Sequence, residues 1–233
     1  MVKVAAGNML PCLQDRWKTS CRERVSFANY PKIQDLIPQG EWGIVPMISE
    51  GDTQVRIKWE DEQGKINIKG QLSDVDTQGW LSELFRIRGV DQAVLDRMVQ
   101  PEMQQIQLLA ELHKIMSDEE FDKVSGYLTA YSFGKSINVN TASEVVLESM
   151  GIKNPSLIVA HRVETPYKQG DTIPGATGVQ TRGNQNITNF LVTSSTNTVY
   201  KVYSHATVGG YTKQIEAVIN MNNSSTPLYW RAL

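Results

Sequence analysis

Residues 54–69 read QVRIKWEDEQGKINIK, and this stretch carries the strongest strand pattern in the chain. Its first half alternates apolar with charged residues, and a period of two indicates a strand with one buried face. The residues DEQG at 61–64 supply a turn, and the alternation resumes at 65–68. We therefore predict a β-hairpin over residues 54–69.

The pattern changes after this hairpin. Across residues 73–163, apolar side chains recur three to four positions apart, which is typical of helices. Ser117 and Glu120 have the spacing of a capping box, which predicts a helix start. Residues 164–186 are rich in Gly, Thr and Gln and are predicted to form a loop. The expected helices after residue 100 cover 104–116, 117–131, 143–150 and 155–163.

Strand patterns return at the C-terminal end of the chain, at 187–193, 199–208 and 211–221. A helix is expected near the N-terminus, over residues 11–29, where Pro11 suits a first helical turn. Segregated strand and helix blocks indicate an α+β fold. We predict a discontinuous sheet domain, residues 1–72 and 187–233, that is interrupted by an all-helical domain at 73–186.

Composition excludes several classes of protein. The 233 residues are 40% hydrophobic and 21% charged, which suits a globular chain, and the net charge of −2 argues against a nucleic-acid binder. No run approaches the ~18 apolar residues of a membrane span, so the chain as given is predicted to be soluble. Cys12 and Cys21 match no zinc or redox motif, and their redox state stays open.

The sequence contains no catalytic motif around its three histidines, and we predict no catalytic residue and no enzyme. Asp74 and Asp76, and the acidic residues at 118–122, could hold a metal ion. Both groups are interpreted instead as helix N-termini, where acidic side chains are favoured by the helix dipole. No metal-ligating residue is predicted.

The most specific local pattern is SINVNTAS at 136–143, followed by two short helical segments on either side of Gly151. Asn140 or Thr141 is expected to cap the first of these helices, and Gly151 permits the turn between them. This arrangement resembles the helix-hairpin-helix unit of DNA-binding proteins. The hairpin lacks a second glycine, so we favour a structural helix pair and predict no nucleic-acid partner.

Two motifs in this order resemble the minor pseudopilin of the K type (general secretion pathway protein K) from bacterial type II secretion systems. The first is an Asp-Glu-x-Gly-Lys-hydrophobic-Asn segment, and the second is hydrophobic-Asn-hydrophobic-Asn-Thr-Ala. The resemblance implies a pilin-like head, with an N-terminal helix and an antiparallel sheet, and an inserted domain of helix-hairpin-helix-like pairs. The structural motif residues are Asp61, Glu62, Gly64, Lys65, Asn67, Asn138, Asn140, Thr141 and Gly151.

The resemblance implies a mechanical function at the tip of the pseudopilus, with the I- and J-type minor pseudopilins as partners and the secreted substrate as a further candidate. It implies a periplasmic head of an inner-membrane-anchored Gram-negative protein, whose N-terminal anchor is missing here. Some relatives bind calcium, the one cofactor that the resemblance raises. Trp17 and Phe27 are the candidate partner-binding residues, and packing on the protein's own sheet is the alternative for both.

Two other functions stay open at this point. One is a DNA-binding surface or competence protein that uses the helix-hairpin-helix, which would bind any duplex in a salt-dependent way. The other is a minor pilin of a type IV pilus, which shares the pilin-like head.

Overall fold

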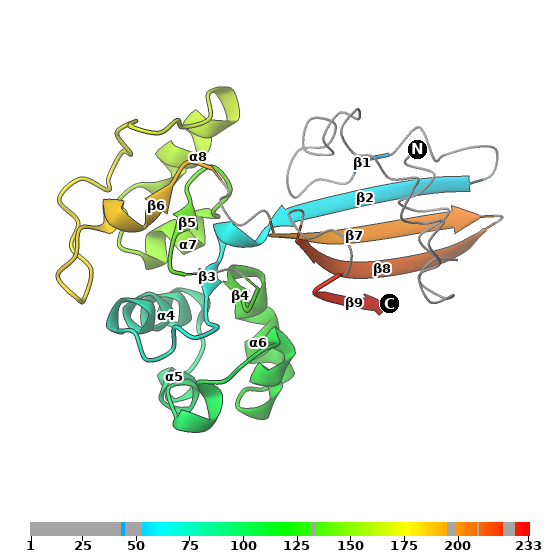
Figure 1. Ribbon diagram of the computed structural model, residues 1–233, viewed down its shortest axis with the longest axis horizontal. Helices are drawn as coiled ribbons and strands as arrows, with labels where there is room; N and C mark the ends of the chain where they lie inside the picture. Colours follow the sequence, from blue (N-terminus) through cyan, green and yellow to red (C-terminus); the bar gives the residue numbers. More distant parts are fainter. Residues whose placement is uncertain (1–42, 45–52, 132–133, 195–198, 209, 221–226) are drawn as a thin grey trace. The chain divides into compact units, whose positions relative to one another are not determined.

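The computed structural model of the chain describes residues 43–44, 53–131, 134–194, 199–208, 210–220 and 227–233 (Figure 1). The predicted helix at 11–29, Trp17, Phe27 and both cysteines lie outside these residues. The chain divides into two compact units. Residues 1–60 and 200–233 form the first, here called the sheet unit, and residues 61–199 form the second, here called the helical unit.

The sheet unit is built around a five-stranded sheet of order β1-β2-β7-β8-β9 (Figure 1). β1 pairs antiparallel with β2, and β8 pairs antiparallel with β9. β2 and β7 are neighbours in the sheet although the whole helical unit separates them in sequence. The strands are β1 (Gly43–Ile44), β2 (Thr53–Asp61), β7 (Val199–Val208), β8 (Tyr211–Asn220) and β9 (Tyr229–Ala232).

One face of this sheet carries the apolar cluster that the alternation predicts. Val55, Ile57 and Trp59 of β2 are buried, and Tyr200 and Val202 of β7 pack against them. The Trp59 and Tyr200 rings meet edge to face, with centroids 5.5 Å apart. Burying each large apolar side chain stabilises the fold by about 1.5–3 kcal/mol, so this face holds the sheet together.

The predicted hairpin at 54–69 is wrong. Residues 61–64 do not turn β2 back on itself; β3 (Ile66–Asn67) instead pairs in parallel with β4 (Leu128–Thr129). A short 3-10 helix, η4 (Glu62–Gly64), lies between β2 and β3, and all three of its residues are buried. A solvent-facing hairpin turn would leave them exposed. The alternation at Ile66 and Ile68 reflects burial in the helical unit.

The helical unit packs its helices around one apolar core, to which Trp80, Leu84, Leu128 and Leu147 contribute. Two short parallel strand pairs, β3–β4 and β5–β6, lie inside it. Its helices are α4 (Val75–Arg88), α5 (Gln92–Met98), α6 (Asp118–Val124), α7 (Glu144–Ser149) and α8 (Pro155–Glu164), and its 3-10 helices after η4 are η5 (Pro101–Met103), η6 (Leu109–Lys114), η7 (Ser125–Tyr127) and η8 (Ile187–Phe190). β5 (Ile137–Asn138) and β6 (Leu191–Val192) complete it.

The units divide at 60/61 and 199/200, whereas the sequence placed the divisions at 72/73 and 186/187. Residues 66–72 and 187–190 lie with the helical unit because Ile66, Leu72 and Phe190 belong to its core. The predicted strand at 187–193 is correspondingly a 3-10 helix followed by the two-residue strand β6, which pairs with β5.

Local capping explains where most helices begin. The Ser117–Glu120 capping box is present at the start of α6, as the spacing predicts. The expected cap of α7 at Asn140 or Thr141 is wrong: the Ser143 hydroxyl accepts the Val146 N–H at 3.2 Å, because the helix starts at Glu144.

The predicted helix at 104–116 is reduced to the 3-10 helix η6. The Glu111 carboxylate accepts the backbone N–H groups of Gln107 and Leu108 at 2.9 and 3.0 Å. The bond from the Gln107 N–H, followed by those from the Lys114 ammonium and the Leu108 N–H, holds the pKa of Glu111 down to about 2. The carboxylate thereby satisfies donors immediately before η6, so the chain can begin the helix at Leu109.

Candidate functional site

The two sequence motifs, at 61–67 and 137–142, meet in the helical unit at the carboxylate of Asp61. Its Oδ1 accepts the Gln63 N–H at 2.9 Å, which caps η4. Its Oδ2 accepts the Asn138 amide at 2.9 Å and the Thr141 hydroxyl at 2.8 Å. Asp61 is 1% exposed, and a buried polar atom is costly unless it is hydrogen-bonded. The second motif therefore supplies two of the donors that allow Asp61 to be buried.

Glu62 forms the other half of this site with Lys65 and Thr129. The Lys65 ammonium lies 2.7 Å from Glu62 Oε1, and both side chains are almost completely buried. The Thr129 hydroxyl donates to Glu62 Oε2 and accepts the Tyr131 N–H at 3.0 Å. We call the set Asp61, Glu62, Gly64, Lys65, Thr129, Asn138 and Thr141 the buried polar junction. It is the point at which the chain enters the helical unit from β2.

The buried polar junction has no space for a side chain at position 64, so this residue must be a glycine. A Cβ at this position would lie 2.9 Å from the carbonyl carbon, the carbonyl oxygen and the hydroxyl of Thr141. Contacts below 3.0 Å are essentially never seen for a real Cβ. The close approach of the η4 backbone to Thr141 thus explains why the first motif contains a glycine.

The two remaining asparagines of the motifs fix neighbouring loops. The Asn67 amide donates to the Gly134 carbonyl at 3.0 Å. The Asn140 amide donates to the carbonyls of Tyr167 and Thr193, at 2.9 and 2.7 Å, and its Oδ1 accepts the Tyr167 N–H at 2.8 Å. Asn140 therefore ties the second motif to the beginning of the 164–186 loop.

Gly151, the last predicted motif residue, is not part of the buried polar junction. It has a φ of +87°, which permits the turn between α7 and α8, as predicted. The backbone N–H of Lys153 in this helical hairpin donates to the Gly175 carbonyl at 3.4 Å. A Cβ on Gly175 would lie only 2.0 Å from the Lys153 carbonyl oxygen. The 164–186 loop is therefore packed directly on the backbone of the hairpin.

Arg162, near the end of α8, is hydrogen-bonded to other residues of the helical unit. Its guanidinium donates to the carbonyls of Val139 and Ala142, at 2.7 and 2.5 Å. Burial lowers the pKa of Arg162 below its usual range. His161, the preceding residue, stacks on the Tyr167 ring with centroids 4.6 Å apart. The guanidinium of Arg162 is therefore bonded within the helical unit.

The acidic groups do not form a metal site in the part of the chain that the structure describes. Within these residues, no group of three His, Cys, Asp or Glu side chains could hold a metal ion. Asp118 pairs with His113, Glu119 with Lys123, and Glu120 with Ser117, so this cluster serves the start of α6. Asp74 and Asp76 share the ammonium of Lys135, so the residues present do not fit calcium there.

A hollow of about 580 Å³ lies between the 169–177 segment and residues 188–194. Threonine side chains line much of it, and among the described residues of its lining Asp171 is the one with an ionisable side chain. The Asp171 carboxylate accepts the Lys168 N–H at 2.7 Å.

Several residues that organise the helical unit were not singled out from the sequence. Thr129, Lys135 and Gly175 each join segments far apart in the chain. Only Lys135 carried a signal, because it directly precedes the second motif. No residue pattern indicated which loop Gly175 would contact.

The chain belongs to a class of α+β proteins in which a complete helical unit is inserted, in sequence, between two neighbouring strands of a sheet. Among the described residues, no helix has the length and apolarity needed to cross a membrane.

No protein-family model matches the chain, and no curated protein matches it. Among solved structures, the chain is similar to one chain of the GspK-GspI-GspJ complex from the enterotoxigenic Escherichia coli type 2 secretion system. The TM-score is 0.61 at 14% sequence identity, over 83% of this chain and 84% of the other. The protein therefore shares the fold of a chain of that pseudopilin complex.

Proposed function

We propose that this protein is a K-type minor pseudopilin, a structural tip subunit of the type II secretion pseudopilus. In this function it assembles with the I- and J-type minor pseudopilins to initiate or cap the fibre and helps to export folded proteins. The head would lie in the periplasm, and the protein would act mechanically rather than as an enzyme. The fold shared with a chain of the GspK-GspI-GspJ complex supports this proposal.

The observation that carries the tip position is the insertion of residues 61–199 between two adjacent strands, β2 and β7. A unit of this length has a radius of gyration of about 14 Å. Each subunit in the middle of a fibre is covered by the next copy, so an extra unit of this size on every copy would obstruct stacking. At the end of a fibre it meets no such obstacle.

A stable complex with the other minor pseudopilins is the expected result of the first test. The chain would be mixed with the soluble heads of the I- and J-type pseudopilins of its organism and analysed by size exclusion with light scattering. We expect a 1:1:1 species. Separate elution at high micromolar concentration would contradict the proposal.

Alanine at Trp17 or Phe27 tests whether the segment 11–29 makes the contact. Large aromatic residues at the centre of an interface typically contribute about 2 kcal/mol or more, or about thirtyfold in affinity. Tyr211→Ala is a matched control, because this tyrosine is 84% exposed on β8. Circular dichroism would establish that each variant is folded. Unchanged affinity in both aromatic variants would remove this segment from the interface.

The DNA-binding alternative is disfavoured by the bonds that the α7–α8 hairpin makes with other segments of the helical unit. A helix-hairpin-helix binds phosphate through free backbone N–H groups, whereas the Lys153 N–H is bonded to Gly175. Arg162 is likewise bonded to two carbonyls. The type IV pilus alternative shares the head design and is separated from our proposal by which partners bind.

A further inference from the structure

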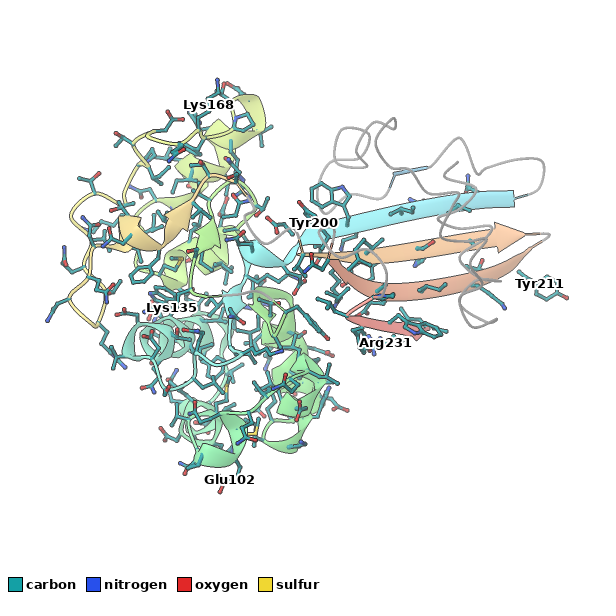
Figure 2. The ribbon with its side chains drawn as sticks, in the orientation of Figure 1. Glu102, Lys135, Lys168, Tyr200, Tyr211 and Arg231 are labelled. Carbon is teal, nitrogen blue, oxygen red and sulfur yellow. The ribbon has the colours of Figure 1, made fainter. Side chains whose placement is uncertain are left out.

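Lys135 lies beside α4 in the helical unit (Figure 2). Its ammonium is 2.9 Å from Asp74 Oδ2 and 3.5 Å from Asp76 Oδ2. Asp74 caps α4 by accepting the N–H groups of Asp76 and Thr77, at 3.1 and 3.0 Å. The ammonium therefore contacts both acidic side chains at the start of this helix.

Asp76 extends these contacts to the 164–186 loop. It is 1% exposed, and its Oδ1 accepts the Gly183 N–H at 2.6 Å. A Cβ on Gly183 would lie 2.8 Å from the same oxygen, so a side chain at residue 183 would displace the Asp76 carboxylate from this position. The side chain of the preceding Arg182 packs over Gly79 in α4, 3.5 Å from where a Cβ of that glycine would lie. The loop is thus docked on α4 through the buried Asp76 carboxylate and the packing of Arg182.

The position of the ammonium matches that of a structural cation. It is bonded to two carboxylates and lies 4.7 Å from the centre of the Phe190 ring, a favourable cation–π distance. The N-terminus of α4 adds a second source of positive potential at Asp74. A divalent ion would need these same carboxylate oxygens and would be repelled by the ammonium.

We propose that Lys135 is a built-in cation that docks the 164–186 loop on α4, in place of a bound metal ion. The charges at this point are balanced within the chain, so the docked loop does not depend on calcium in the surroundings. This inference is independent of the proposed function, because it concerns how the helical unit maintains its own structure.

The pKa shifts of Asp74 and Lys135 agree with the docking that we propose for Lys135. Burial acts to raise the pKa of Asp74, but hydrogen bonds from Lys135 and the Thr77 N–H outweigh it and hold the pKa lower than usual. Burial acts to lower the pKa of Lys135, and its bonds to the two carboxylates raise the pKa above its ordinary value. Both groups are therefore charged across the physiological pH range.

Trypsin cleavage after Arg182 reports on the docking directly, because the next residue, Gly183, provides the N–H that Asp76 accepts. Lys135→Met removes the charge and keeps an unbranched side chain. Loss of a charged hydrogen bond predicts about tenfold to a hundredfold faster cleavage at this bond, identified by mass spectrometry. Asp76→Asn should also accelerate cleavage, and Lys135→Arg should retain slow cleavage.

Lys123→Met is the matched control. Lys123 also pairs with a carboxylate, Glu119, at 2.7 Å, but on an exposed helix surface. Exposed pairs contribute little, so cleavage after Arg182 should stay within about twofold of the wild-type rate. Wild-type cleavage rates in both Lys135→Met and Asp76→Asn would overturn the proposal.

Calcium provides the second measurement, which needs no variant. The melting temperature of the wild-type protein is expected to be the same in EDTA and in about 10 mM calcium, a concentration above the weakest dissociation constants of extracellular calcium sites, about 1 mM. An increase of several degrees with calcium would show that a metal ion stabilises the fold, and the proposal would be wrong.

Discussion

Alanine at Glu62 is expected to lower the free energy of unfolding of the helical unit by about 3–5 kcal/mol. The Glu62 carboxylate lies 2.7 Å from the Lys65 ammonium, and their side chains are 3% and 9% exposed. It also accepts the hydroxyl of Thr129 from β4. The substitution deletes a buried carboxylate that is bonded both to the Lys65 ammonium and to the Thr129 hydroxyl, and breaking a buried ion pair costs far more than breaking an exposed one.

Chemical denaturation combined with peptide-resolved hydrogen exchange would measure this loss, because exchange distinguishes amides of residues 61–199 from those of the sheet unit. Glu83→Ala is the matched control. Glu83 forms the same (i, i+3) ion pair with Arg86 at 2.6 Å, but at the surface, so it should cost at most about 1 kcal/mol. Equal losses in the two variants would mean that the buried polar junction does not stabilise the helical unit.

Alanine at Gly175 is expected to detach the 164–186 loop from the α7–α8 hairpin. The new Cβ would lie 2.0 Å from the Lys153 carbonyl oxygen, and the backbone has a φ of +73°, which side chains disfavour. A left-handed conformation costs about 1–2 kcal/mol for an alanine, and overpacking costs about 1–3 kcal/mol more. The free energy of opening of the loop should therefore fall by about 2–5 kcal/mol.

Gly178→Ala separates these two causes within the same loop. Gly178 has a φ of +76°, but nothing lies within 4 Å of its Cβ position, so only the backbone strain of about 1–2 kcal/mol applies. Hydrogen exchange of the amides in residues 166–186 would compare the two variants. Equal protection in both would show that the close approach to Lys153 is unimportant.

The features that the sequence predicted correctly are local ones. The alternation of Val55, Ile57 and Trp59 indicated a buried strand face, and the sheet buries all three. The Ser117–Glu120 capping box starts α6, and Gly151 makes the turn between α7 and α8, as predicted. The capping box and the glycine turn act within a few residues, so their physical cause is visible in a short window of sequence. The alternation on β2 shows which face is buried, although the side chains that cover it, Tyr200 and Val202, lie far along the chain.

The features that were predicted wrongly depend on distant partners. The alternation at Ile66 and Ile68 indicated burial but could not identify β4, more than 60 residues later, as the parallel partner. Thr141 seemed suited to cap a helix, yet its hydroxyl is bonded to Asp61. A short polar side chain can satisfy a nearby N–H or a remote carboxylate equally well, and only the packed fold selects between them.

The same reasoning explains why the two motifs were found but their contact was not. Each is recognisable as a run of residue types, and the resemblance to K-type pseudopilins rested on their order. The bonds from Asn138 and Thr141 to Asp61 give a physical reason for the two motifs to occur together, because the second motif donates to a buried carboxylate of the first. The chain of the GspK-GspI-GspJ complex that shares this fold is only 14% identical. Whether it contains the same contact between two such motifs is therefore a feature to look for in its structure.

The most direct test of the proposed tip position is to locate the protein on an assembled fibre. Purified pseudopili would be labelled with gold-conjugated antibodies against residues 61–199 and viewed by electron microscopy. If the inserted helical unit restricts the subunit to an end, label will be found at one tip of each fibre. Label distributed along the fibres would contradict the proposed function.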